Sequence, residues 1–183
     1  KPKSPNMSET VEQALATLRA LHPKKIDLGL GRIQSVLSKL DNPEQKMPPI
    51  IHVAGTNGKG STIANLRAMA EAQGLTAHVY TSPHLVHFRE RIVVSDKEIS
   101  DETLVDVLTR VRDANAGEPL SFFEATTAAA YLAFSESPAD IALIEVGLGG
   151  RYDATNVITP ACCAITAIDY DHAEFLGRDL AGI

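Results

Sequence analysis

The chain has 183 residues, of which 44% are hydrophobic and 22% charged, and its formal net charge is −6. This size and composition predict one globular domain with a sizeable core. The negative charge argues against a nucleic-acid surface, which needs clustered basic residues, and no apolar run approaches the ~20 residues of a membrane-spanning helix. The polar residues 1–10 lack the apolar centre of a signal peptide and are expected to form a frayed terminus.

Helical and extended patterns alternate along the chain. Apolar residues recur at helical spacing, which predicts helices over residues 9–21, 31–40, 61–74, 101–117 and 121–137. Short apolar runs predict strands over residues 48–55, 75–83, 89–96, 139–150 and 161–172. Ser100 is expected to cap the fourth helix, and residues 82–92 are expected to form a functional loop. The alternation predicts an α/β fold, with a mostly parallel sheet covered on both faces by helices.

The two cysteines, Cys162 and Cys163, are neighbours in an apolar run. Adjacent residues of a strand point to opposite faces, so no disulfide between them is expected, and their spacing does not suit a metal site. We expect both to be small buried hydrophobic residues. This pattern indicates a protein of a reducing, cytoplasmic compartment.

The stretch HVAGTNGKGST, residues 52–62, is close to a phosphate-binding loop but has a compressed spacing. The usual loop reads G-x-x-x-x-G-K-[ST], whereas here two residues separate Gly55 from Gly58, and Gly60 follows Lys59. Glycines at a helix start let backbone amides turn toward an anion, with Lys59 as a mobile cation. The alternative is a tight strand-to-helix turn with an exposed lysine.

Acidic and polar residues follow the predicted strands at their carboxyl ends, where parallel sheets place ligand sites. Glu145 ends an apolar run and is expected to hold Mg²⁺; the alternative is a salt bridge to Arg151. Asp169, Asp171 and His172 follow another apolar run, although a lone histidine is usually structural. Ser82 either reaches a metal or phosphate, or satisfies its own turn.

Five ordered segments carry a resemblance to a known family: HVAGTNGKGST, TSPHLVHFRER, SFFEATT, EVGLGGRYDATN and DYDHAEFLG. They resemble the folylpolyglutamate synthase and dihydrofolate synthase family of the Mur ligase superfamily, from about residue 9 to the last residue. The resemblance implies a P-loop mononucleotide-binding fold of the Mur ligase central domain type. It also implies an ATP-dependent amide ligase. ATP converts a pteroate or folate carboxylate into an acyl phosphate, and the amine of L-glutamate then attacks it.

The resemblance also implies roles for individual residues. The catalytic residues would be Lys59, Glu145 and His172. ATP would be bound by Gly55, Thr56, Asn57, Gly58, Lys59, Gly60, Ser61 and Thr62. Mg²⁺ would be held by Ser82, Glu145, His172 and Ser61. Pterin or folate would contact Asp27, Leu28, Gly29, Ser121, Phe122, Phe123, Glu124, Tyr152, Asp153 and Ala154. Because adjacent helical residues face different ways, one of the two phenylalanines is expected to belong to the core.

The family's chain is longer than this sequence and has a separate carboxyl-terminal domain that helps to bind glutamate. Family members continue into a KAGI motif with a carbamylated lysine; the terminal LAGI of this sequence resembles it but falls too early, and Leu180 cannot supply the amine. We therefore expect residues 1–183 to be a partial amino-terminal and central ATP-binding domain. Its expected partners are dihydropteroate or folate and L-glutamate, without nucleic acid or membrane, and a monomer is expected.

Two other functions stay open at this point. The first is another Mur-type ligase that adds an amino acid to a cell-wall precursor. The second is a nucleotide-binding regulatory module without turnover. Whether the protein makes dihydrofolate, extends polyglutamate tails or does both does not follow from these residues.

Overall fold

The computed structural model describes residues 10–21, 29–172, 176–177 and 179. Its centre is a six-stranded sheet with the order β4-β3-β2-β5-β1-β6. The strands are β1 (Ile50–Ala54), β2 (Ala77–Tyr80), β3 (Ile92–Val94), β4 (Lys97–Glu98), β5 (Ile141–Glu145) and β6 (Cys162–Ile165). Strands β2, β5, β1 and β6 run parallel, and β3 and β4 add an antiparallel hairpin at one edge. The predicted mostly parallel sheet is confirmed.

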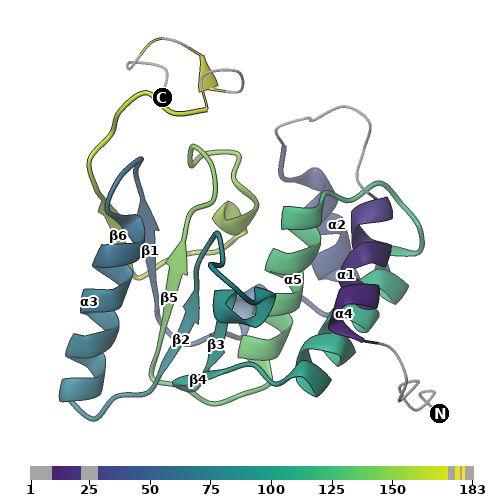
Figure 1. The fold of residues 1–183 in the computed structure, drawn as a ribbon, viewed down its shortest axis with the longest axis horizontal. Helices are drawn as coiled ribbons and strands as arrows, with labels where there is room; N and C mark the ends of the chain where they lie inside the picture. Colours follow the sequence, from purple (N-terminus) through teal and green to yellow (C-terminus); the bar gives the residue numbers. More distant parts are fainter. Residues whose placement is uncertain (1–9, 22–28, 173–175, 178, 180–183) are drawn as a thin grey trace.

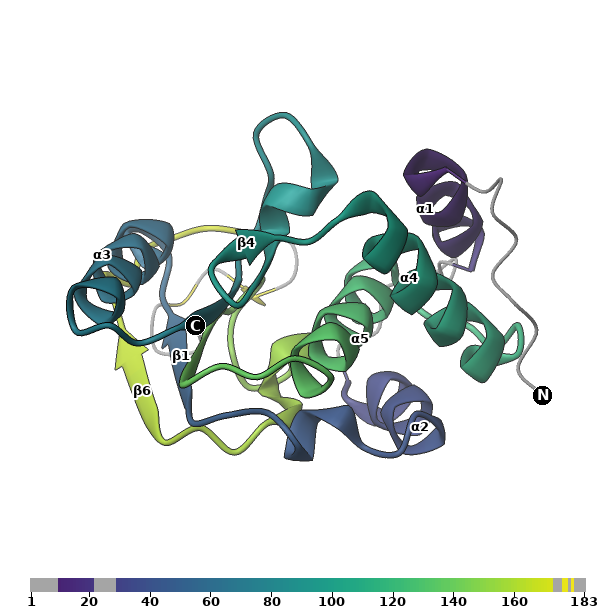
Figure 2. The same ribbon diagram turned by 90° about the horizontal axis from the view of Figure 1, so that it is seen from below.

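Helices cover the two faces of the sheet unequally (Figures 1 and 2). The α-helices are α1 (Val11–Ala20), α2 (Gly31–Lys39), α3 (Lys59–Ala72), α4 (Asp101–Asn115) and α5 (Phe122–Ser135). Short 3-10 helices are η1 (Pro43–Gln45), η2 (Phe88–Arg91) and η3 (Ala154–Val157). Helix α3 lies on one face, and α5 lies on the other with α1, α2 and α4 outside it. Among the described residues, no helix has both the length and the apolar character to span a membrane.

Side-chain caps explain where two of these helices begin. The Ser121 hydroxyl accepts a hydrogen bond from the Glu124 amide at 3.1 Å, and the Glu124 carboxylate accepts one from the Ser121 amide at 2.7 Å. This reciprocal pair satisfies two amides at the start of α5. The Ser100 hydroxyl accepts from the Thr103 amide at 3.1 Å, which confirms Ser100 as the cap of α4.

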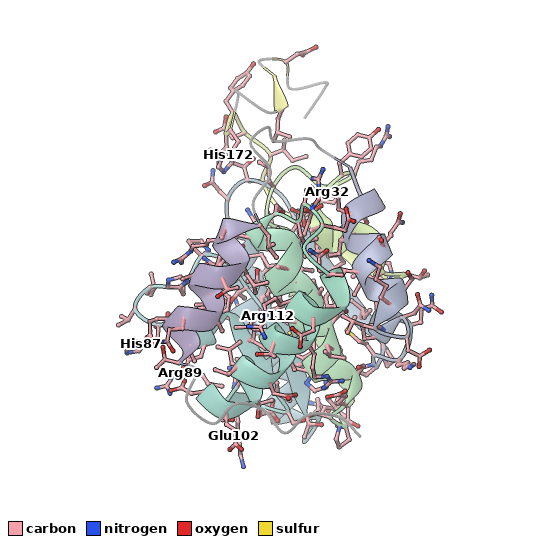
Figure 3. The ribbon with its side chains drawn as sticks, turned by 90° about the vertical axis from the view of Figure 1, so that its right-hand side faces the viewer. Arg32, His87, Arg89, Glu102, Arg112 and His172 are labelled. Atoms are coloured by element: carbon pink, nitrogen blue, oxygen red, sulfur yellow. The ribbon has the colours of Figure 1, made fainter. Side chains whose placement is uncertain are left out.

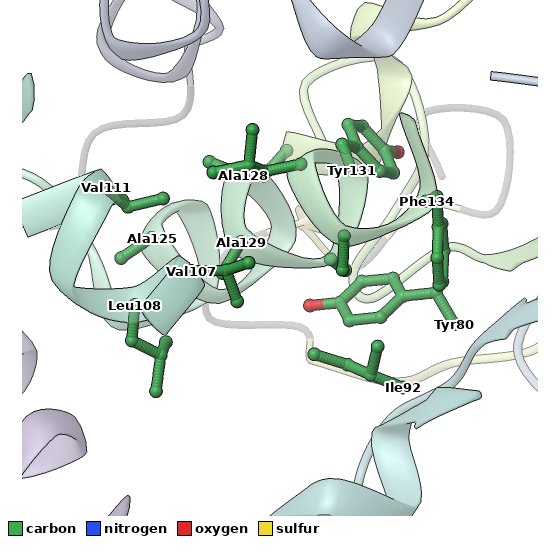
Figure 4. Packing of buried hydrophobic residues seen from close by; sticks show 14 of the residues in the cluster. Tyr80, Ile92, Val107, Leu108, Val111, Ala125, Ala128, Ala129, Tyr131 and Phe134 are labelled. Carbon is green, nitrogen blue, oxygen red and sulfur yellow. The ribbon is translucent and has the colours of Figure 1, made fainter. Parts of the chain in front are cut away.

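The larger core lies between the sheet and α5 and continues into the outer helices (Figure 4). Alanines give α5 a thin profile: Ala125, Ala128 and Ala129 are fully buried, so the sheet and α4 both approach it closely. Tyr131 and Phe134 fill the remaining space, and burying each large side chain stabilises the fold by about 1.5–3 kcal/mol. A second, smaller core lies under α3 and consists of Val53, Ile63, Ala77, Val79, Val93 and Leu143.

Several boundaries differ from the sequence prediction: β6 ends at Ile165 and not at residue 172, and two further differences have a local cause. Helix α3 begins at Lys59, two residues before the predicted residue 61, because Gly58 at φ 90° supplies a left-handed N-cap. Residues 82–92, predicted as a loop, contain η2. There the Glu90 carboxylate accepts hydrogen bonds from the amides of Leu85, Val86 and His87, which winds the chain into a turn.

The prediction that Cys162 and Cys163 are buried is wrong. Both thiols are free and exposed, and Ile165 on the same strand is 71% exposed. Strand β6 pairs with β1 at the edge of the sheet. An apolar run indicates that a segment favours burial. Whether an edge strand is actually buried depends on what packs against it in the tertiary structure. In the part of the chain that the structure describes, that packing leaves β6 exposed.

Candidate functional site

The glycine-rich segment forms the turn between β1 and α3, at the edge of the sheet where the parallel strands end (Figure 1). Gly55 has φ 127° and Gly58 has φ 90°, conformations that residues with a side chain rarely adopt. A Cβ atom on Gly55 would lie 2.1 Å from the Thr166 hydroxyl oxygen. Glycine at position 55 is therefore required by close packing as well as by backbone conformation.

Lys59 lies at the first position of α3 and folds back over the turn. Its Nζ donates hydrogen bonds to the carbonyl oxygens of Gly55 at 2.8 Å and Thr56 at 3.2 Å. The side chain is half-buried, so its ammonium is presented at the turn itself. A cation held over a glycine turn at a helix start is suited to bind a phosphate group.

The turn is also tied to the chain beyond β6. The amides of Thr56 and Asn57 both donate to the Ala167 carbonyl, at 2.8 and 3.2 Å. The Thr56 hydroxyl exchanges hydrogen bonds of 3.0 Å with the backbone of Asp169. At the helix start, Ser61 is exposed and the Thr62 hydroxyl donates to the Gly58 carbonyl at 2.8 Å. The conformation of the turn thus depends on residues 166–169.

Glu145 is the last residue of β5 and is only 5% exposed. Its Oε2 accepts a hydrogen bond from the Ser82 amide at 3.1 Å. Burial raises the pKa of the Glu145 carboxyl above its usual value, while the Ser82 amide and the positive charge of Lys59 act in the opposite direction. Arg151 is exposed, and the described residues include no ion pair between it and Glu145. Lys59, Ser82 and Glu145 therefore lie at the same edge of the sheet, and their roles in binding ATP or Mg²⁺ stay a prediction.

His172 lies apart from these residues. It is exposed, and its Nε2 is 3.7 Å from a carboxylate oxygen of the adjacent Asp171. Figure 3 shows it in the segment beyond β6, above the body of the domain. The described residues include no contact between His172 and Glu145, and no three of their His, Cys, Asp or Glu side chains gather as a metal site. Its role as a metal ligand stays a prediction.

Two of the predicted substrate segments, residues 121–124 and 152–154, meet at Gly147. A Cβ atom there would lie 2.4 Å from the Phe123 ring and 3.0 Å from Asp153 Oδ2, so both side chains pack against the glycine backbone. Phe123 also stacks on Tyr80 with ring centroids 6.1 Å apart. Ala154 is buried beside them, whereas Tyr152 is 54% exposed. The structure thus places Phe123 and Asp153 against the same backbone position.

Two of the other predicted substrate residues, Phe122 and Glu124, have partners within the protein. Phe122 meets Phe88 edge-on at 5.9 Å, and Arg19 lies 4.8 Å above its ring. The Glu124 carboxylate is 4% exposed and is occupied by the Ser121 cap and by Arg32, whose Nε lies 3.1 Å away. Gly29 is half-buried. Asp27 and Leu28 lie outside the described residues.

Sequence reasoning missed a buried polar network beneath these segments. His52, in the middle of β1, is 6% exposed, and its Nε2 lies 2.9 Å from the Thr155 hydroxyl oxygen. The Thr155 hydroxyl donates to Asp153 Oδ1 at 2.5 Å. A histidine inside an apolar strand is a signal that was present in the sequence, because a buried polar side chain requires a partner. The partner itself, 103 positions away, gave no local signal.

A cavity of about 960 Å³ opens between α1, the segment before η2 and the start of α4. Figure 3 shows His87, Arg89 and Glu102, three of its lining residues, at the end of the domain opposite His172. No residue of the glycine turn lines it. Phe88, in its wall, contacts Phe122, so the cavity adjoins the substrate segment and not the phosphate turn.

Comparisons with known proteins agree with this geometry. No family model matches the chain. The chain is 42% identical over 163 residues to the dihydrofolate synthase/folylpolyglutamate synthase of Haemophilus influenzae, covering 89% of this chain and 37% of that protein. The structure is similar to that of E. coli FolC in complex with DHPP and ADP, with a TM-score of 0.91, 36% identity and coverage of 98% and 43%. For the bifunctional Yersinia pestis enzyme complexed with AMPPNP and Mn ion, the TM-score is 0.87 at 37% identity, with coverage of 97% and 43%.

A glycine turn with its lysine at the carboxyl ends of parallel strands defines a P-loop type of mononucleotide-binding α/β domain. The comparisons narrow this class. Over most of its length, the chain is homologous to the dihydrofolate synthase/folylpolyglutamate synthase family, which confirms the resemblance predicted from its motifs. The chain spans 37% and 43% of the length of two of these relatives.

Proposed function

We propose that this chain is the ATP-binding part of an ATP-dependent ligase that joins L-glutamate to dihydropteroate, to folate polyglutamates, or to both. The observation that carries the proposal is the convergence of Lys59 and Glu145, from different elements, at the edge of the sheet where the glycine turn lies. Curated relatives at 36–42% identity have names that state these activities. Because the chain spans about two fifths of them, the remaining parts of the site would come from outside it.

Phosphoryl transfer to a carboxylate brings two anions together, so catalysis depends on neutralising and aligning charge. Lys59 provides a positive charge at the turn. The backbone amides at the start of α3 add the positive end of the helix dipole. These groups would bind the ATP phosphates and hold the terminal phosphoryl group in line with the substrate carboxylate.

The residues at the strand ends fit a divalent cation. The buried Glu145 carboxylate accepts one hydrogen bond in the described part of the chain, from the Ser82 amide, and a buried charge of this kind is stabilised by a cation. Ser82 and Ser61 add hydroxyl oxygens, the ligand type that Mg²⁺ prefers. Mg²⁺ held by Glu145, Ser82 and Ser61, with His172 as a further predicted ligand, would neutralise charge on the phosphate oxygens.

Phe123 would contact the heterocycle of the substrate, and Asp153 would hold the loop beside it. An aromatic ring against a glycine backbone presents a flat apolar surface, on which a pterin can stack. The Asp153 carboxylate is 5% exposed and already accepts hydrogen bonds from the Leu148 amide and from Thr155, so it would act by holding the loop backbone beside this surface. We also propose a cytoplasmic location, which the two free, exposed thiols of Cys162 and Cys163 support, because a reducing compartment preserves them.

The proposal is tested by measuring ADP release from the complete protein that carries this chain. Dihydropteroate, a folate monoglutamate and L-glutamate are added singly and in pairs. We expect ADP release to require one pteroate-type carboxylate together with glutamate. Equal stimulation by a cell-wall precursor would indicate a different Mur-type ligase. Absence of stimulation by every carboxylate would indicate a nucleotide-binding module without turnover.

A further inference from the structure

A chain of buried hydrogen bonds connects β1 with the candidate substrate segment. The Thr155 hydroxyl has one proton, and it donates that proton to Asp153 Oδ1. The contact of 2.9 Å between His52 Nε2 and the same hydroxyl oxygen therefore requires the histidine to donate. Nε2 of His52 therefore carries a proton, and burial lowers the His52 pKa, which favours the neutral ring, although the Asp153 charge acts in the opposite direction.

The Asp153 carboxylate also accepts hydrogen bonds from the backbone around it. Its Oδ2 accepts from the Leu148 amide at 2.7 Å, and its Oδ1 also accepts from the Thr155 amide at 3.0 Å. Leu148 follows Gly147, against which the Phe123 ring packs. The orientation of one carboxylate thus fixes the loop after β5 relative to η3.

The Thr155 backbone is held from a second direction. Tyr131 of α5 is fully buried, and its hydroxyl donates to the Thr155 carbonyl at 2.8 Å. Thr155 is itself 0% exposed. Neither His52 nor Thr155 is placed to touch a ligand directly, because both are covered by protein. Any effect they have on binding must act through Asp153 and the Leu148 amide.

We propose that His52 is a positioning residue for substrate recognition. Acting through Thr155, it holds the Asp153 carboxylate in the orientation that places the Gly147–Leu148 backbone and the Phe123 ring for a flat heterocyclic substrate. The proposal rests on the proposed function for the identity of that substrate. It assigns a role to a residue of the strand that leads into the phosphate turn, although the turn itself is not part of the network.

Two substitutions of His52 separate positioning from packing. His52→Leu removes the donor, whereas His52→Gln keeps an amide donor close to the position of Nε2. Dihydropteroate and a non-hydrolysable ATP analogue are titrated separately by calorimetry. We expect His52→Leu to weaken dihydropteroate binding about tenfold and ATP-analogue binding less than about twofold, with most of the loss restored in His52→Gln. Equal weakening of both ligands, or no rescue by glutamine, would overturn the proposal.

Thr155 gives a matched pair that also covers the case in which His52→Leu does not fold. Thr155→Ser keeps the hydroxyl, and Thr155→Val removes it with little change of shape. Amide hydrogen exchange at Leu148 is compared in the two variants without any ligand. We expect exchange about tenfold faster in Thr155→Val. Equal exchange would overturn the proposal. If exchange differs as expected but the wild-type chain binds no dihydropteroate, the positioning stands and the proposed function fails.

Discussion

Glu145 and Ser82 lie 63 positions apart in the chain, yet the carboxylate of one accepts a hydrogen bond from the amide of the other at 3.1 Å. The contact joins the carboxyl ends of β5 and β2, which are parallel neighbours in the sheet. Lys59 lies near enough for its positive charge to act on the pKa of the Glu145 carboxyl. The sheet topology therefore brings to one edge a carboxylate and a cation that are far apart in the chain.

Gly55→Ala is expected to destabilise the protein and distort the glycine turn. The new Cβ would lie 2.1 Å from the Thr166 hydroxyl, at a φ of 127° that alanine rarely adopts. We expect a loss of about 2–4 kcal/mol in the free energy of unfolding, measured by chemical denaturation. Gly60→Ala is the matched control, because no atom lies within 4 Å of its Cβ position. Its stability should equal or slightly exceed that of the wild type, since alanine favours a helix.

Gly147→Ala tests whether the two substrate segments depend on close packing. Its Cβ would lie 2.4 Å from the Phe123 ring, which would have to move. We expect a loss of about 1–3 kcal/mol of stability, together with weaker dihydropteroate binding. Gly150→Ala, in the same loop with no atom within 4 Å of its Cβ position, should leave both unchanged. If the two variants bind dihydropteroate equally well, the Phe123 ring does not form the substrate surface.

The burial of His78 leads us to expect that the free energy of unfolding falls as the pH is lowered. The ring is fully buried, stacks on Phe134 at 4.6 Å, and accepts a hydrogen bond from the Ser95 amide on Nδ1. Burial lowers the His78 pKa below its usual value of 6.5, although the Ser137 carbonyl opposes this shift. The unfolded state therefore binds a proton at a higher pH than the folded state. The stabilisation is fully present above pH 6.5 and is lost as the pH falls toward the folded value.

The measurement is the free energy of unfolding at pH 7 and pH 5. Each histidine of this kind contributes a slope of at most about 1.4 kcal/mol per pH unit, and His52 contributes with the same sign because burial lowers its pKa too. His78→Gln should reduce the slope. A wild-type stability that is constant or rises between pH 7 and pH 5 would show that these histidines are not buried in the neutral form.

Lys59→Ala is expected to weaken nucleotide binding while leaving the fold intact. The side chain is half-buried and its recorded hydrogen bonds are to carbonyl oxygens of the turn, so its loss should shift the thermal midpoint by only a few degrees, about 2–4 °C. Affinity for an ATP analogue should fall about tenfold or more. Lys97→Ala, at an exposed lysine in β4, is the control and should change neither quantity. A large loss of stability in Lys59→Ala would show that the lysine is structural.

Local signals predicted much of the fold. The helical spacing before Gly74 and the cap at Ser100 indicated α3 and α4 to within a few residues, because both depend on neighbours in the chain. The glycine turn and Glu145 were found for a related reason: chemistry-bearing residues at the ends of apolar strands are brought to one edge by a parallel sheet.

Features that depend on distant contacts were not predicted. Cys162 and Cys163 were expected inside, but β6 is an edge strand and leaves them exposed. Glu124 matched a substrate segment, yet its carboxylate is occupied by Arg32, 92 positions away. His52 was passed over because nothing near it in the chain indicated a partner. These outcomes share one cause. Burial and pairing are decided by the packed structure, whereas the sequence indicates only which residue types favour burial.

The central claim is that Glu145 acts with Lys59 at a site for a magnesium-bound nucleotide. The most direct test is calorimetric titration of a non-hydrolysable ATP analogue, with and without Mg²⁺, into the wild type and Glu145→Gln. Glutamine keeps an acceptor for the Ser82 amide and removes the charge. We expect Mg²⁺ to tighten binding about tenfold or more in the wild type and less than about twofold in the variant, with similar thermal midpoints. An identical Mg²⁺ effect in both proteins would contradict the account.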